Sequence, residues 1–139
     1  MMVDDEMGTR LELRLPPEPA AVAASRRSIE AVPEISRHPQ LLLNIQLVVS
    51  ELVTNGVRHG GAVGPLWVML AVRRGVVRVE VVDTGEGFDR GSVLRTPMNP
   101  AAVSGRGLHL VDAIADRWGM LFDGRTRVWA EFELPGAVA

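Results

Sequence analysis

The predicted strands of this sequence alternate between apolar and polar residues, and this alternation limits the folds open to the chain. It is clearest in residues 10–15, 76–83 and 126–134. Every second side chain of a strand points to the same face, so one face of the sheet is covered and the other meets water. We therefore predict an α+β fold: a two-layer α/β sandwich with a largely antiparallel mixed sheet and three helices on one face.

Three segments have the periodicity of helices. Residues 20–32 are rich in alanine and end at Pro33, and residues 39–60 carry an apolar stripe at helical spacing. The third helix is expected over residues 106–115. Two hairpins are also predicted, one over residues 66–83 with its turn at 73–75, and one over residues 118–134 with its turn at 123–125.

The length of 139 residues suits a single domain, which we expect over residues 9–135. The acidic residues 1–8 are predicted to be disordered, and residues 136–139 form a C-terminal tail. Residues 84–105 are rich in turn residues and have no period. A loop this long inside a compact domain is usually functional or disordered.

The composition excludes several classes of site. There is no cysteine, and all 15 basic residues are arginine, so disulfides, thiolate metal sites and a P-loop lysine are absent. The net charge of −2 argues against direct nucleic-acid binding. No apolar run is long enough to span a membrane, and the N-terminus lacks a signal peptide, so the expected location is the cytoplasm.

The second predicted helix carries polar residues on one flank. Glu51, Asn55 and His59 recur at every fourth position, which stacks their side chains along one line of the helix. A carboxylate, an amide and an imidazole in one line suit a site for a metal-bound anion. A solvated helix face is the alternative, and the helix taken alone favours it.

Asp83 ends a predicted strand on the same side as Val77, Val79 and Val81. A core-facing carboxylate is costly unless it has a partner, so Asp83 is a candidate acceptor for an exocyclic amine such as that of adenine. Gly85 and Gly87 follow it and let the backbone approach a ligand closely. The alternative is an ordinary turn.

A third polar segment precedes the last predicted helix, at Gly105, Arg106, Gly107 and Leu108. Unpaired N–H groups at a helix start, with the positive end of the helix dipole, favour an anion. A flexible helix start is the alternative, and for this tetrapeptide alone it is the better interpretation.

In their order along the chain, the segments ELVTNGVRH, DTGEGF and GRGLHLVD resemble the N, G1 and G2 boxes of the GHKL ATPase superfamily, whose nucleotide pocket is the Bergerat fold. Within it the chain is most similar to the small anti-sigma-factor serine/threonine kinases. The resemblance covers residues 10–134. It implies a histidine-kinase-like ATP-binding domain in which residues 88–104 form the ATP lid.

The resemblance also implies roles for single residues. Asn55 coordinates Mg²⁺, Glu51 is the general base, and His59 lies near the phosphates. Asp83 accepts a hydrogen bond from the adenine amine, and Gly85 and Gly87 shape the pocket beside it. The phosphates are held by the glycine-rich segment before the last helix, namely Gly105, Arg106, Gly107 and Leu108. Gly56 departs from the pattern, since alanine is usual there, and a helical glycine costs about 1 kcal/mol relative to alanine.

As a function, the resemblance implies a Mg-ATP-dependent serine/threonine protein kinase. It would phosphorylate an anti-sigma-factor antagonist protein of the STAS type and sequester a sigma factor, and the family also admits a homodimer. The alternative is a nucleotide-binding regulatory module that holds a partner protein without significant kinase activity. The ATPase domain of a sensor histidine kinase is disfavoured, because no dimerisation helices or phosphoacceptor segment precede the domain.

Overall fold

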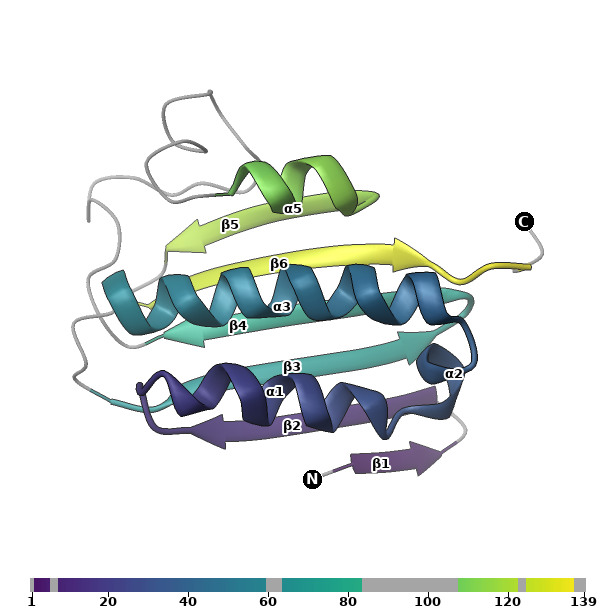
Figure 1. Ribbon diagram of the computed structural model, residues 1–139, viewed down its shortest axis with the longest axis horizontal. Coiled ribbons are helices and arrows are strands. Elements are labelled where there is room, and N and C mark those ends of the chain that lie inside the picture. Colours follow the sequence, from purple (N-terminus) through teal and green to yellow (C-terminus); the bar gives the residue numbers. More distant parts are fainter. Residues whose placement is uncertain (1, 6–7, 60–63, 84–107, 123–124, 137–139) are drawn as a thin grey trace.

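The computed structural model describes residues 2–5, 8–59, 64–83, 108–122 and 125–136. The described elements form two layers, a twisted sheet and a layer of helices that lies over one of its faces (Figure 1). The strands are β1 (Met2–Asp5), β2 (Gly8–Leu15), β3 (Leu66–Arg73), β4 (Val76–Asp83), β5 (Arg117–Phe122) and β6 (Thr126–Glu133). The helices are α1 (Ala20–Glu30), α2 (Pro33–Ser36), α3 (Pro39–His59) and α5 (His109–Ile114).

The sheet has the strand order β1-β2-β3-β4-β6-β5, and every described pairing of neighbouring strands is antiparallel. The predicted two-layer sandwich is confirmed, and its described strands form an antiparallel sheet without a parallel pair. The β3–β4 hairpin turns at Arg74 and Gly75, whose φ angles are 52° and 77°. Two successive residues with positive φ match the turn that best fits the twist of a hairpin.

The core lies between α3 and the middle of the sheet. Alternate residues of β4, among them Val77 and Val79, are fully buried under α3, which contacts β3, β4 and β6. α3 presents a continuous apolar stripe to them, including Ile45 and Leu52. The alternation along β6 is confirmed in the same way, because Ala130 is fully buried and its neighbours in the strand are only partly so.

α1 packs beside α3 through small side chains and a set of polar contacts. Ser25 is fully buried, and its hydroxyl donates to the carbonyl of Ala21 at 2.8 Å. The buried amide of Gln46 donates both to the Arg26 carbonyl and to Glu30 Oε1, each at 3.1 Å. These bonds satisfy the polar groups that the helix pair removes from water.

Three details differ from the sequence-based expectations. Met2–Asp5, within the segment expected to be disordered, pair with β2 as an edge strand. α1 ends at Glu30, two residues before the predicted end at residue 32, and Pro33 opens the short helix α2, since the first helical position tolerates a missing N–H. The last helix spans His109–Ile114, so Leu108 and Ala115 of the predicted range 106–115 lie outside it, and residues 106–107 lie outside the described ranges.

In the ranges that the structure describes, no helix combines the length and the apolar character needed to cross a membrane.

Candidate functional site

The polar flank of α3 borders the buried stripe of that helix. Glu51 and Asn55 are half-buried, whereas Leu52 and Val53 between them are fully buried. Residues four apart share a helix flank, so Glu51 and Asn55 lie in one line at the edge of the core, as predicted. His59 ends the helix, and its side chain lies outside the described residues.

Gly56 lets α3 approach the sheet closely. A Cβ atom at this position would come within 2.8 Å of Leu66 Cδ2, closer than real Cβ contacts allow. Gly56 and Leu66 are both buried, so the contact is enclosed by the core. Alanine is usual at this position in the family that the sequence resembles. Glycine is explained here by packing, because it allows the end of α3 to lie directly against the start of β3.

Asp83 lies at this same end of the sheet. It is the last residue of β4, and Val82 beside it pairs with Trp67 near the start of β3, next to Leu66. Only 7% of Asp83 is exposed, so the predicted core-facing direction of its side chain is confirmed. The end of α3, which carries Asn55, and the end of β4, which carries Asp83, thus occupy one end of the molecule (Figure 1).

Thr126 is a candidate residue that the sequence analysis did not identify. It opens β6 directly opposite Asp83 in the strand register, and 3% of it is exposed. Its hydroxyl has no hydrogen-bond partner in the part of the chain that the structure describes. A buried hydroxyl without a partner destabilises the folded protein by about 1–3 kcal/mol. A bound ligand that hydrogen-bonds to Thr126 would remove this cost.

A signal for Thr126 was present in the sequence. It occupies the inward parity of β6, where the following inward residues Val128, Ala130 and Phe132 are apolar. A polar residue at the start of a buried row is the same pattern that singled out Asp83 at the end of β4. The pairing of β4 with β6, which brings the two together, is not visible in the local sequence.

The third predicted segment is described only at its end. Leu108 immediately precedes α5 and is fully buried, and α5 packs against α3 and β5. The structure therefore gives the Leu108 side chain a place in the core, and the role of its N–H group stays a prediction. The remaining predicted residues lie outside the described ranges, namely Gly85, Gly87, Gly105, Arg106 and Gly107, as does the predicted lid, residues 88–104.

A magnesium ion at this end would find few ligands on the described part of the protein. Those ranges contain no group of three histidine or acidic residues that could hold a metal. The half-buried Asn55 on the polar flank of α3 would offer such an ion one amide oxygen. Mg²⁺ usually keeps several waters and takes one or two protein ligands with substrate phosphates, so Asn55 fits an ion that arrives with a triphosphate.

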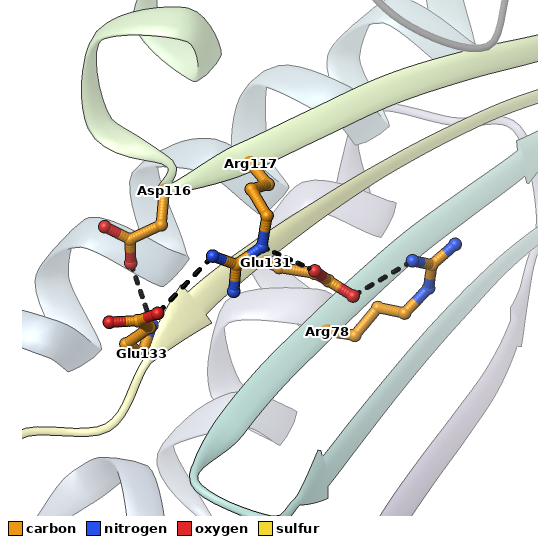
Figure 2. A network of polar contacts seen from close by, with 5 residues as sticks. All are labelled: Arg78, Asp116, Arg117, Glu131 and Glu133. Carbon is orange, nitrogen blue, oxygen red and sulfur yellow. Dashed lines mark hydrogen bonds and ion pairs between the residues drawn. The ribbon is translucent and has the colours of Figure 1, made fainter. Parts of the chain in front are cut away.

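The opposite face of the sheet carries a separate charged network. Figure 2 shows Arg78 and Arg117 reaching Glu131 from two sides, with N–O distances of 3.1 and 2.9 Å. Partial burial disfavours the ionised Glu131, but the hydrogen bonds from both arginines outweigh it, so the pKa of Glu131 lies below its usual value. The hydrogen bonds to Glu131 and Glu133 raise the pKa of Arg117. This network lies away from Asp83 and Asn55.

Comparison with known proteins agrees with the architecture. The family model for the histidine kinase-like ATPase domain matches residues 15–131. A search among curated proteins gives no match. A crystal structure of the RsbU and RsbW domains of Rv1364c from Mycobacterium tuberculosis superposes with a TM-score of 0.62 at 19% sequence identity. The match covers 90% of this chain and 32% of that chain, so this chain spans about a third of that protein, and the likeness concerns the fold.

Proposed function

Because the chain belongs to the histidine kinase-like ATPase domain family, we propose that it binds Mg-ATP at the end of the sheet that carries Asp83. The candidate residues with described side chains come from α3, from the facing ends of β4 and β6, and from Leu108 at the start of α5. In this proposal the adenine lies over the ends of the two strands, and the phosphates extend toward the flank of α3.

One observation carries the adenine assignment: the buried Asp83 carboxylate and the buried Thr126 hydroxyl face each other in register. Adenine presents an amine donor next to a ring nitrogen acceptor. Asp83 accepts from the amine, and Thr126 donates to the neighbouring nitrogen, directly or through a water molecule. Binding of adenine thus removes the cost of the hydroxyl that has no described partner.

At the phosphate end, Asn55 would hold Mg²⁺ through its side-chain oxygen. When bound, the ion would supply positive charge next to the transferred phosphoryl group. Glu51, one helical turn before Asn55, acts as the general base that orients and deprotonates the attacking hydroxyl. His59 and the segment Gly105–Leu108 complete the phosphate site in this proposal, with Gly85 and Gly87 beside the base.

For the reaction we propose transfer to a serine or threonine hydroxyl of an antagonist protein, with a sigma factor as the second partner. This rests on the resemblance of the three boxes to anti-sigma-factor kinases and on the fold shared with a structure that contains an RsbW domain. The alternative, a module that binds nucleotide and partner without transfer, uses the same pocket and differs only in what Glu51 does.

Calorimetric titration with ATP, with and without Mg²⁺, tests the proposed site. We expect Mg-dependent binding that Asp83→Asn weakens, because a neutral amide has one acceptor oxygen in place of two and accepts more weakly than a charged carboxylate. Asn55→Ala should weaken only the Mg-dependent part. A flat titration under both conditions contradicts the proposal.

The role of Glu51 needs a second measurement. Incubation of the protein with labelled ATP and a set of antagonist domains detects phosphoryl transfer. We expect Glu51→Ala to abolish transfer and to leave ATP binding intact. Transfer retained in this variant removes the general-base assignment, and binding without transfer in the unaltered protein favours the regulatory module.

A further inference from the structure

A groove runs along β3 on the sheet face away from the helices. Its floor is formed by the half-buried side chains of Trp67, Met69 and Ala71, and its volume is about 740 Å³. The outward side chains of β2 and β4 form its two walls, because these strands pair with β3 on either side. Successive floor residues are two positions apart in the strand, so they repeat at about 6.8 Å along the groove.

The wall on the β2 side alternates in charge. Its exposed residues are Arg10, Glu12 and Arg14, and the strand register sets each of them beside one residue of the floor. The guanidinium of Arg14 lies 5.8 Å from the centre of the Trp67 ring. Arg10 and Glu12 already make contacts within the protein, so a ligand would share or exchange them. This wall therefore presents a positive, a negative and a positive charge at the repeat of the floor.

The wall on the β4 side is held in place by β6. Arg78 donates to Glu131 at 3.1 Å (Figure 2), and Glu80 lies 4.0 Å from Arg127. These contacts order the wall before anything binds, which reduces the entropy that binding must remove. Arg78 and Glu80 repeat the order of charge found on the β2 wall, so both walls favour the same ligand.

A ligand in this groove must offer charges of alternating sign at about 6.8 Å, and alternate side chains of an extended peptide have this spacing. We propose that the groove binds an extended segment of a partner protein in which an acidic, a basic and an acidic residue occupy every second position. The first acid contacts Arg10, the base contacts Glu12 and the second acid contacts Arg14.

The dimensions of the sheet suit such a segment. Neighbouring strands lie about 4.8 Å apart, so a charged group above β3 is about 5 Å from either wall. The aliphatic parts of glutamate and lysine side chains lie over the apolar floor, while their charged ends reach the walls. Each charge of the ligand is thus met by opposite charge, and its apolar stem is removed from water.

The partner is a different protein, because this chain lacks the required segment. The chain contains no lysine, and none of its arginines has one acid two positions before it and another two positions after it. A uniformly acidic or uniformly basic segment would meet like charge on at least one wall position, which is costly. The inference does not rest on the proposed ATP site.

Fluorescence anisotropy with labelled peptides tests the order of charges. The probe peptide contains the segment EVKVE, and a control peptide of the same composition contains EVEVK. In either direction the control sets an acid against Glu12. We expect the probe to bind the full chain with a Kd below about 1 mM, and the control to bind about tenfold more weakly.

Two variants locate the binding site. Ala71→Leu fills part of the floor without a change of charge and should weaken binding of the probe about tenfold. The variant R10E/E12R/R14E reverses the β2 wall and should lower the ratio of affinities for EVKVE and KVEVK about tenfold. Arg27→Glu, an equal change of net charge at an exposed position on α1, is the control and should leave both affinities unchanged. Circular dichroism confirms that each variant is folded.

Absence of binding by EVKVE up to about 1 mM overturns the proposal. So does equal affinity for EVKVE and EVEVK, because the groove then does not distinguish the order of charges. A preference that the folded wall variant retains shows that the peptide binds elsewhere. Sedimentation velocity adds one further outcome: a dimer that excess probe does not dissociate shows that a second copy occupies this face, which also overturns the proposal. None of these measurements needs nucleotide, so their failure is distinct from failure of the proposed ATP site.

Discussion

The Thr126 hydroxyl lends itself to a test in which stability and ligand binding change in opposite directions. Replacing Thr126 with valine exchanges the hydroxyl for a methyl group in a site that is 3% exposed. The buried hydroxyl has no described partner, and leaving such a group unpaired costs about 1–3 kcal/mol. We therefore expect Thr126→Val to raise the free energy of unfolding of the nucleotide-free protein by about 1 kcal/mol, at the low end of that range.

Thr9 provides a matched control. It is also an inward-facing threonine of the sheet, 2% exposed, but its hydroxyl donates to the Glu34 carboxylate. A hydrogen bond to a charged group contributes about 1.5–3 kcal/mol, so Thr9→Val should lower the free energy of unfolding by about 2 kcal/mol. The same chemical change is thus expected to have opposite signs at two buried threonines.

Urea denaturation without nucleotide measures both stabilities, and calorimetry with Mg-ATP measures affinity. We expect Thr126→Val to weaken ATP binding by about tenfold, the equivalent of one hydrogen bond, and Thr9→Val to leave affinity unchanged. A destabilisation of Thr126→Val as large as that of Thr9→Val would refute the reasoning on stability. An unchanged ATP affinity would refute the place of Thr126 in the adenine site.

Three other predictions follow from described contacts. Gly56→Ala gains about 1 kcal/mol of helix propensity but forces Leu66 to move, which costs about 1–3 kcal/mol, so denaturation should show net destabilisation; in a Leu66→Ala background the same change should stabilise. The lowered pKa of Glu131 means that its contribution to stability is present above the usual value of 4.5 and is lost as pH falls below it. Stability measured from neutral pH to about pH 3 should therefore fall less steeply in Glu131→Gln than in the unaltered protein; equal slopes would contradict this. Asp83→Asn should reduce the preference for ATP over GTP in competition binding, since guanine has a carbonyl where adenine has its amine and an amide, unlike a carboxylate, can donate to a carbonyl; an unchanged preference would remove that role.

Local sequence patterns were sufficient to predict the helices and strands and the buried position of Asp83. The alternation of valines in β4 predicted both the strand and the buried direction of Asp83, because side-chain parity is a local property of extended chain. The hairpin turn at Arg74 and Gly75 and the long helix through Asn55 were predictable for the same reason.

Contacts between segments that are far apart in the sequence could not be predicted from local patterns. Thr126 becomes a candidate only because β6 pairs with β4, and no local pattern specifies which strands become neighbours. Gly56 looked like a weak point of a helix until its contact with Leu66 was known. The register that sets Arg10 opposite Ala71 and Glu12 opposite Met69 is likewise not specified by any local pattern.

The strand order has a consequence for how the molecule assembles. The β3–β4 and β5–β6 hairpins each join residues close in sequence, whereas the β2–β3 and β4–β6 pairings join residue 15 to residue 66 and residue 83 to residue 126. Loop closure over a longer segment costs more entropy, so the two hairpins form early and these two pairings form later. Asp83 and Thr126 terminate the β4–β6 pairing, so a nucleotide that bridges them would stabilise a late-forming part of the sheet.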